Sequence, residues 1–459
     1  MYKKNSIIKQ KSIINFIIIC IVSAVTFVWS CDEEDISTVA PHDPSKPVQI
    51  TDFEPKTGGL ATKVLISGSN FGGDLSKINV WFTGNEGQTR LLAPLVGSNG
   101  DNLYVLTPRL SGLTEISISV EVEGATPAVA NTDFIYRTMT TVTTIAGRRG
   151  TTEFVEGTLS EASFLRPHTL CVDDEGNIFV SHWGRPNAWV NPSFVLVSPH
   201  GNRVVALHRG TEFGAPTVDA DGVVIVPTDP THGFFYFDPQ EQWAPRQRQI
   251  LQPTEEMLAE RDPEGEPIWR AFNIDWKHSM TYSAWDGMIY TRGYNAQLVK
   301  FDPQTRFGSQ VNIIPAGNSN SYPYVDPNHP YFIYIAYNNA GQIWRYDLRD
   351  NTHVLYAGQA IPGWKDGFRL DAEFRGPTQI VILPNGDMYV ADSGNHCIRK
   401  ITPDGMVTTL IGKGGIAGYQ DGNPEDALFD TPTGIAIGKD GSVYVADSEN
   451  QAIRRLAEE

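Results

Sequence analysis

Cysteine is rare in this chain, and motifs that hold metal ions are missing from it. Only four cysteines occur among 459 residues, and no Cys-x-x-Cys or His-x-x-His pattern is present. Such spacings are the usual sequence mark of a zinc site. The sequence therefore predicts neither a bound metal nor another cofactor.

Basic residues are also in short supply. The chain has 36 lysines and arginines against 53 acidic residues, which gives a net charge of −17. The first 30 residues contain four lysines and no acidic residue, so without them 32 basic residues face 53 acidic ones, a charge of −21. Proteins that bind nucleic acid need clustered lysine and arginine to meet the phosphates. We therefore expect no nucleic-acid partner.

Long apolar runs are absent except near the beginning of the chain. Residues 13–28 form an apolar run of 16 residues, and four lysines precede it. A membrane-spanning helix needs about 20 apolar residues. The shorter run with a basic start favours an export signal. An uncleaved signal anchor is the alternative.

The segment that follows the apolar run resembles a bacterial lipoprotein signal. Ser30 places a small residue before Cys31, and residues 32–35 are all acidic. The resemblance implies a signal peptide over 1–30 and a lipid on Cys31. The acidic run is similar to the surface-export signal of Bacteroidetes lipoproteins, although it also suits a plain solvated tether. We therefore expect 31–47 to be a lipidated cysteine, an acidic tether and a proline-rich linker. The protein would be anchored in the outer membrane and face the exterior.

Residues 48–137 have the pattern of a small β-sandwich. Short alternating apolar runs, such as 80–82 and 115–120, are separated by turn residues. The stretch from Thr62 to Gly72 reads T-K-V-L-I-S-G-S-N-F-G and resembles the IPT/TIG immunoglobulin-like domain. The resemblance implies a spacer role, with direct ligand binding as the alternative.

One phrase occurs three times in the rest of the chain. Residues 157–167, 367–377 and 422–432 each begin with Gly, carry Phe seven residues later and end with Pro ten residues later. Short β-branched and aromatic runs follow, separated by Asn-Gly or Asp-Gly turns, which is typical of β-hairpins. Turn residues at 176, 222, 287, 330, 386 and 441 mark six units of four strands. This pattern predicts a six-bladed β-propeller over 138–459.

The sixth unit is one strand short, because the chain stops soon after residues 453–456. Residues 142–147 match 407–412, so we expect them to supply the missing strand and close the ring. The run Y-V-A-D-S-x-N-x-x-I-R, at 389–399 and 444–454, resembles the NHL repeat. The predicted fold is all-β: an immunoglobulin-like sandwich followed by an NHL-type propeller. We expect Cys171 and Cys397 to be buried thiols in separate blades.

The loops between the second and third strands diverge from blade to blade. In blades five and six their Asp and Asn residues are expected to cap turns. Elsewhere aromatic side chains stand beside Asn, Arg and His, which suits sugar recognition because a flat ring covers a pyranose while polar groups meet its hydroxyls. The same residues suit a protein interface, and packing within a blade is a further alternative. The candidate ligand-binding residues are His182, Trp183, Arg185, Trp189, Arg292, Tyr294, Asn338 and Trp364.

Three further residues are expected at the mouth of the propeller channel, namely His168, His278 and Tyr322. Two histidines at a channel are similar to NHL-like lyases and lactonases that hold a metal on the propeller axis. Those sites need three or four inward ligands, and the equivalent positions of blades five and six are Thr378 and Thr433. We therefore assign no metal ligand and no catalytic residue.

The order of lipid anchor, tether, IPT/TIG domain and NHL propeller resembles cell-surface lipoproteins of Bacteroidetes. Those proteins are accessory to starch-utilisation-type uptake systems and work beside a TonB-dependent transporter and its partner lipoproteins. The first hypothesis is thus a non-catalytic binding protein for a glycan or another oligomeric nutrient. An enzyme, either a polysaccharide lyase or a lactonase, is the second. A scaffold that contacts only the transporter is the third.

Overall fold

The computed structural model describes residues 39–59, 62–84, 89–108, 110, 115–137, 140–151, 153–182, 192–228, 232–275, 277–314 and 320–458. The chain divides into two compact units. One comprises 1–108 and 113–135, and the other comprises 109–112 and 136–459. No helix in the described residues is long and apolar enough to cross a membrane.

The first unit is a β-sandwich of two antiparallel sheets. One sheet has the order β1-β3-β7-β6, and the other has the order β2-β10-β8-β4-β5 with β9 beside β8. Their bounds are β1 Gln49–Glu54, β2 Thr57–Gly58, β3 Lys63–Gly72, β4 Ile78–Gly84, β5 Thr89–Leu92, β6 Leu95–Ser98, β7 Gly100–Leu106, β8 Glu115–Val122, β9 Ala128–Val129 and β10 Phe134–Tyr136. Every second residue of β8 is buried, as the alternation of strand side chains requires. The rings of Phe53 and Phe82 meet Phe134 in the core, with centroids 6.4 and 5.6 Å apart.

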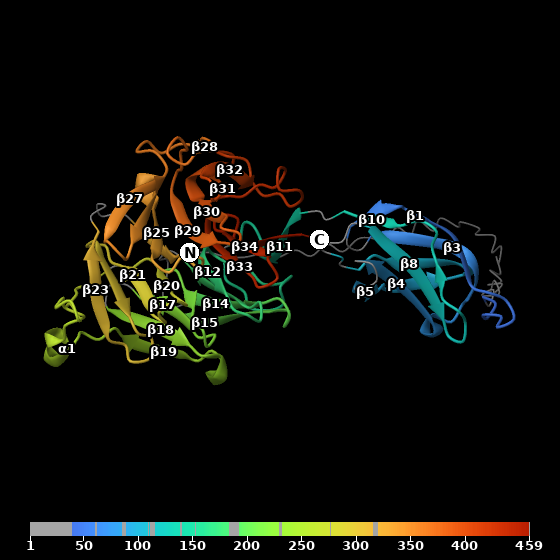
Figure 1. Cartoon of the computed structure of the whole chain (residues 1–459), viewed down its shortest axis with the longest axis horizontal. Helices are drawn as coiled ribbons and strands as arrows, with labels where there is room; N and C mark the ends of the chain where they lie inside the picture. Colours follow the sequence, from blue (N-terminus) through green and yellow to red (C-terminus); the bar gives the residue numbers. More distant parts are fainter. Residues whose placement is uncertain are drawn as a thin grey trace, which may run out of the picture. The chain divides into compact units, whose positions relative to one another are not determined.

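The second unit is a six-bladed propeller, as the sequence predicts. Each blade is one antiparallel sheet. In blades one to four the strands follow the chain from the inside outward, whereas blades five and six also take an outermost strand from an earlier part of the chain. The inner strands are β12 Pro167–Val172, β16 Thr217–Val218, β20 Met280–Tyr282, β24 Ser321–Val325, β29 Pro377–Ile382 and β33 Pro432–Ile437. Consecutive inner strands contact one another all the way around, including β33 with β12, so the ring is closed. In Figure 1 the labels β12, β20, β29 and β33 lie near the middle of the propeller, and β19, β23 and β27 lie at its rim.

The remaining strands complete the blades. Second strands are β13 Ile178–His182, β17 Val224–Pro227, β21 Ile289–Arg292, β25 Phe332–Tyr337, β30 Met388–Asp392 and β34 Val443–Asp447. Third strands are β14 Pro192–Ser198, β18 Gly233–Phe237, β22 Gln297–Phe301, β26 Gln342–Asp347, β31 Cys397–Ile401 and β35 Ala452–Glu458. Outer strands are β15 Arg203–Arg209, β19 Pro245–Gln249, β23 Gly308–Ile313, β27 Thr352–Ala357 and β32 Met406–Ile411, and the short β28 Gly367–Phe368 adds a fifth strand to blade five. A five-residue helix, α1 Glu255–Ala259, lies between blades two and three.

The closing strand is confirmed. β11 (Thr140–Gly147) forms the outer strand of blade six and runs antiparallel to β35, with Thr140 opposite Glu458 and Gly147 opposite Ala452. The first strand of the propeller in the sequence thereby covers the edge that blade six would otherwise expose.

The phenylalanine of the repeated phrase packs between blades. Phe164, Phe374 and Phe429 are fully buried. Phe374 lies in a cluster with Ile343 of blade four and Val390 of blade five, and the other two occupy the same place at the next two junctions. Cys171 and Cys397 are buried free thiols, as expected.

Candidate functional site

The inner strands are tied to one another across the blade boundaries by side chains. An innermost strand has a free edge, and its amides and carbonyls need partners. The hydroxyl of Thr217 accepts from the amide of Tyr282 in the next blade (2.9 Å), and that of Thr281 accepts from Val325 (3.1 Å). Gln379 bonds both the carbonyl and the amide of Leu170, at 3.0 and 2.9 Å. These bonds fix the wall of the axial channel.

The predicted channel-mouth residues do come together on this wall. His168 lies on β12, His278 two residues before β20, and Tyr322 on β24. The ring of Tyr322 stands between the two imidazoles, with centroid distances of 6.5 Å to His168 and 6.4 Å to His278. The cluster is more enclosed than a channel mouth, because His168 is 9% and Tyr322 only 3% exposed.

Burial decides the charge of this cluster. Desolvation lowers the pKa of His168 to about 3, and nearby Arg166 acts in the same direction. Desolvation, with help from Arg292, lowers the pKa of His278 to about 4. Both imidazoles are therefore neutral at physiological pH, and each offers one donor and one acceptor.

The described residues contain no group of three or more His, Cys, Asp or Glu side chains placed to hold a metal ion. The third nearby histidine, His182, packs elsewhere: its ring lies 5.9 Å from Phe154 and 5.7 Å from Phe164. It ends β13 at the register position that Asp392 holds in blade five. His182 therefore fills the core between blades, where we expected it on an exposed loop.

Arg292 is also misplaced by the sequence-based prediction. It is fully buried, not exposed on a loop. Its guanidinium donates to the Ser321 hydroxyl (3.1 Å) and the Ile314 carbonyl (3.0 Å), and it lies 5.1 Å from the ring centre of Tyr337. The side chain is thus taken up in joining blade three to blade four.

Three candidates remain on the described loops. Tyr294, in the turn between β21 and β22, is 38% exposed, and Trp364, between β27 and β28, is 49% exposed. Asn338 opens a short 3-10 turn after β25 and is half-buried. No hydrogen bond or ring contact joins these three side chains within the described residues. Trp183, Arg185 and Trp189 lie outside those residues, as do Cys31 and the lipoprotein signal.

Trp364 has a packing role as well as an exposed face. Its indole N–H donates to the Thr409 hydroxyl (3.1 Å), and its ring lies so close to Gly414 that a Cβ there would fall 2.0 Å from it. In the next blade Tyr419 stands at the same distance before the repeat glycine and bonds Thr144 of the closing strand (3.0 Å). The repeat therefore uses this aromatic position to hold the outer strand.

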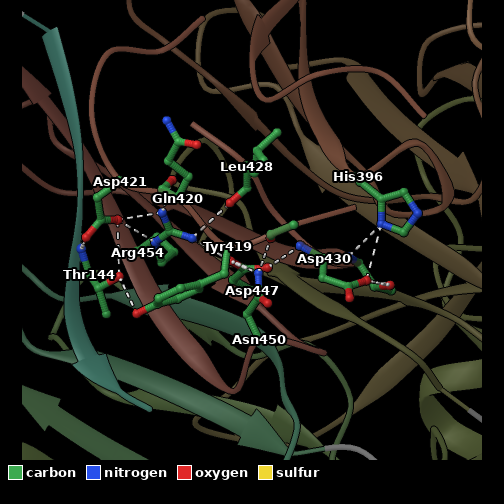
Figure 2. A network of polar contacts seen from close by, with 12 residues as sticks. Thr144, His396, Tyr419, Gln420, Asp421, Leu428, Asp430, Asp447, Asn450 and Arg454 are labelled. Atoms are coloured by element: carbon green, nitrogen blue, oxygen red, sulfur yellow. Dashed lines mark hydrogen bonds and ion pairs between the residues drawn. The ribbon is translucent and has the colours of Figure 1, made fainter. Parts of the chain in front are cut away.

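Sequence reasoning missed the arginine of the repeated motif. Arg454 is fully buried and bonds Asp447 (2.7 Å), Asp421 (2.5 Å) and the carbonyls of Leu428 and Gln420. Asn450 bonds the same Asp447 oxygen at 2.8 Å. Figure 2 shows Arg454 between the two aspartates, with Tyr419 and Asn450 beside it.

Blade five repeats this network with Arg399, Asp392, Asp366 and Asn395. The Asp and Asn were expected to cap their turns, but Asp392 makes no capping bond to its own turn and instead accepts from the Arg375 amide (2.7 Å) of the Gly…Phe…Pro loop. The two residues therefore have a structural role, which is to hold that loop. Because the Arg recurs at a fixed distance after the Asp, the repeat itself carried the signal that was overlooked.

Comparison with protein families agrees with this architecture. The model described as IPT/TIG domain matches residues 47–136, and the model described as NHL repeat matches 374–401 and 429–456, in blades five and six. A curated relative, Protein SUPPRESSOR OF QUENCHING 1, chloroplastic, from Arabidopsis thaliana, is 31% identical over 188 residues. That match covers 38% of this chain and only 17% of the relative's length.

Solved structures match almost the whole chain. An auxiliary nutrient binding protein from Bacteroides thetaiotaomicron VPI-5482 is 25% identical, with a TM-score of 0.58, over 91% of this chain and 99% of its own. An auxiliary nutrient binding protein from Bacteroides ovatus ATCC 8483 is 22% identical, with a TM-score of 0.68, over 92% and 100%. A third structure, also from Bacteroides thetaiotaomicron, has a provisional phosphatase name (21% identity, TM-score 0.58, coverage of 92% and 99%). The fold is common to all of them, while their names differ in function.

Proposed function

We propose that this protein is a surface-exposed outer-membrane lipoprotein that binds a glycan or another oligomeric nutrient beside a TonB-dependent transporter. The observation that carries the proposal is the likeness, over 91% of the chain, to a Bacteroides protein called an auxiliary nutrient binding protein. That likeness covers residues of both compact units, so it is not confined to the propeller.

The signal-like start of the chain supports the proposed location. Residues 13–28 form the apolar part of an export signal, and Cys31 follows at the position of a lipid-bearing cysteine. The acidic residues that come next are similar to a surface-export signal. A lipid anchor and a tether would hold the two folded units outside the membrane.

The proposed place of nutrient contact is the loop face of the propeller. This face is formed by the loops between the second and third strands and by the segments that join each blade to the next. Functional residues concentrate on loops that a rigid scaffold does not need for closure. Blades five and six use their loops for the buried Arg399 and Arg454 networks. Blade three presents the exposed Tyr294 on this face, and the insert before blade five presents Trp364.

Calorimetry against an oligosaccharide panel tests the proposal. We expect the double change Trp183→Ala and Trp189→Ala, or Trp364→Ala, to weaken binding at least tenfold, which is about 1.4 kcal/mol. Trp285→Ala is the matched control, because Trp285 is 51% exposed in a turn between strands one and two, on the opposite face. A pull-down of the transporter separates nutrient binding from a purely scaffolding role. If every loop-face variant binds the oligosaccharide as the wild type does, the nutrient does not bind at the loop face.

An enzyme is the second candidate, and the cluster of His168, Tyr322 and His278 is the observation that favours it. Turnover assays on uronate oligosaccharides and lactones, together with metal analysis of the purified protein, test this alternative. Turnover that is lost in His168→Ala or His278→Ala would place catalysis first.

A further inference from the structure

The propeller contains an axial cavity that the proposed function does not use. Its volume is about 370 Å³, and residues from all six inner strands line it. Each inner strand runs from the loop face toward the turn that joins strands one and two. At one end, the lining begins one residue after the positions equivalent to His168, at Ser279, Tyr322 and Gln379. At the other end, it reaches the turns between strands one and two of blades four and five, at Pro327, Asn328, Leu383 and Pro384. The cavity therefore opens on the turn face, opposite the loops proposed to meet the nutrient.

Most polar groups on the cavity wall already have partners. Thr217 and Thr281 accept amides of the next blade, and Gln379 bonds the backbone of Leu170. Asn328 donates to the carbonyl of Leu383 at 2.8 Å. These groups complete the free edges of the inner strands and have little capacity left for a ligand.

Tyr322 is the exception at the inner end of the cavity. Tyr322 is only 3% exposed, but its hydroxyl is not fully enclosed, and no hydrogen bond joins that hydroxyl to another described residue. The ring is held in place between His168 and His278. A hydroxyl that borders a cavity and lacks a protein partner is able to donate to, or accept from, a ligand or an ordered water.

The lining also determines which charge a ligand could carry. No Asp, Glu, Lys, Arg or His borders the cavity within the described residues. Aliphatic residues such as Ile382 and Ile437 border the cavity beside the polar groups, so its wall is about equally polar and apolar. An ion would lose its hydration there without gaining a counter-charge. A volume of 370 Å³ lies at the lower end of the range for small-molecule sites, which begins at about 300 Å³. It admits one ring or a short chain, not an oligomer.

We propose that this axial cavity is a second binding site, for a small uncharged molecule with an apolar body and one hydrogen-bonding group that meets the Tyr322 hydroxyl. The ligand enters from the turn face. The site is separate from the proposed nutrient-binding face, so this proposal can be correct even if the proposed nutrient binding is wrong.

The test uses three probes with the same body and different charge: 4-fluorobenzyl alcohol, 4-fluorobenzylammonium and 4-fluorobenzoate. Fluorine NMR titration of the purified protein follows each probe. We expect saturable one-site binding of the alcohol and at least tenfold weaker binding of both ions. An oligosaccharide that binds the loop face should leave the alcohol's affinity unchanged.

Two conservative variants locate the site. Tyr322→Phe removes only the hydroxyl and should weaken binding of the alcohol about fivefold to tenfold, in line with the loss of one hydrogen bond. Tyr334→Phe is the matched control, because Tyr334 is a buried tyrosine of the neighbouring strand that does not border the cavity. The proposal is overturned if the alcohol shows no saturable binding, if the ions bind equally well, or if Tyr322→Phe binds like the wild type while its melting temperature is unchanged.

Discussion

Replacing Arg454 with methionine should destabilise the propeller severely. The guanidinium has no exposed surface, and it bonds the equally buried Asp447 at 2.7 Å. Methionine keeps much of the apolar stem but leaves the Asp447 carboxylate without its counter-ion. Removing one partner of a buried pair costs about 3–5 kcal/mol, because the remaining charge stays out of water. We expect a loss of that size in the free energy of unfolding of the propeller.

The loss should depend on pH with a defined sign. Burial already raises the pKa of Asp447 to about 6, against the opposing effect of Arg454. Without Arg454 this folded-state pKa rises further above its unfolded value, so the folded variant takes up a proton more readily than the unfolded chain. Stability that is present at low pH is then lost as the pH rises through the folded-state pKa. The deficit of Arg454→Met against wild type should be larger at pH 8 than at pH 5.

Urea unfolding followed by tryptophan fluorescence at both pH values measures this effect. Lys439→Met is the control, since the ion pair of Lys439 with Asp174 (2.9 Å) is largely exposed and should contribute little. The double change Arg454→Met with Asp447→Asn should cost less than the sum of the single changes, because the two residues form one network. A loss below about 1 kcal/mol, or one equal at pH 5 and pH 8, would refute the reasoning that the buried charge carries the cost.

Three further predictions concern the anchor, the blade junctions and the axial histidines. Cys31→Ser should yield a soluble protein or an unprocessed precursor, and recovery of that variant in the outer membrane with protease-accessible domains would contradict the lipid anchor. Phe374→Ala and Phe429→Ala should each cost about 3–5 kcal/mol in reversible unfolding, because both rings are fully buried between blades. A loss below about 1 kcal/mol would mean that the blades pack without them. The pKa of His278 is lowered to about 4 in the folded state, so its unfolded form takes up a proton first as pH falls below 6.5, and stability is lost from there down to about pH 4. His278→Gln should therefore flatten the fall of the free energy of unfolding between pH 7 and pH 5 by up to about 1.4 kcal/mol per pH unit, whereas parallel curves would show that His278 is not neutral in the fold.

The fold could be predicted because its determinants recur along the chain. The phenylalanine of the repeated phrase is Phe164, Phe374 and Phe429, and the spacing alone places it at equivalent junctions. The turn residues repeat with a similar period, and the match of 142–147 to an outer strand identified the closing strand. Local patterns of this kind survive in sequence because each blade solves the same packing problem.

The candidate site could be predicted only in part, because its contacts cross blade boundaries. Arg292 was expected on the surface, yet its partners Ser321 and Tyr337 come from the next blade. The meeting of His168 with Tyr322 and His278 followed from the alignment of the inner strands. The unpaired hydroxyl of Tyr322 did not, since it depends on what six different strands leave unfilled.

The closing strand has a consequence for the order in which the protein can fold. β11 is synthesised before any blade, but its partner β35 is the last strand of the ring to be made. Until then Val142 and the amides of β11 have no strand to cover them, and unpaired edges of this kind invite aggregation. Pairing Thr140 with Glu458 also joins residues that are far apart in sequence, which makes ring closure a slow, late step. The synthesis of β35 therefore determines whether β11 remains an unpaired edge or pairs with β35 and closes the ring.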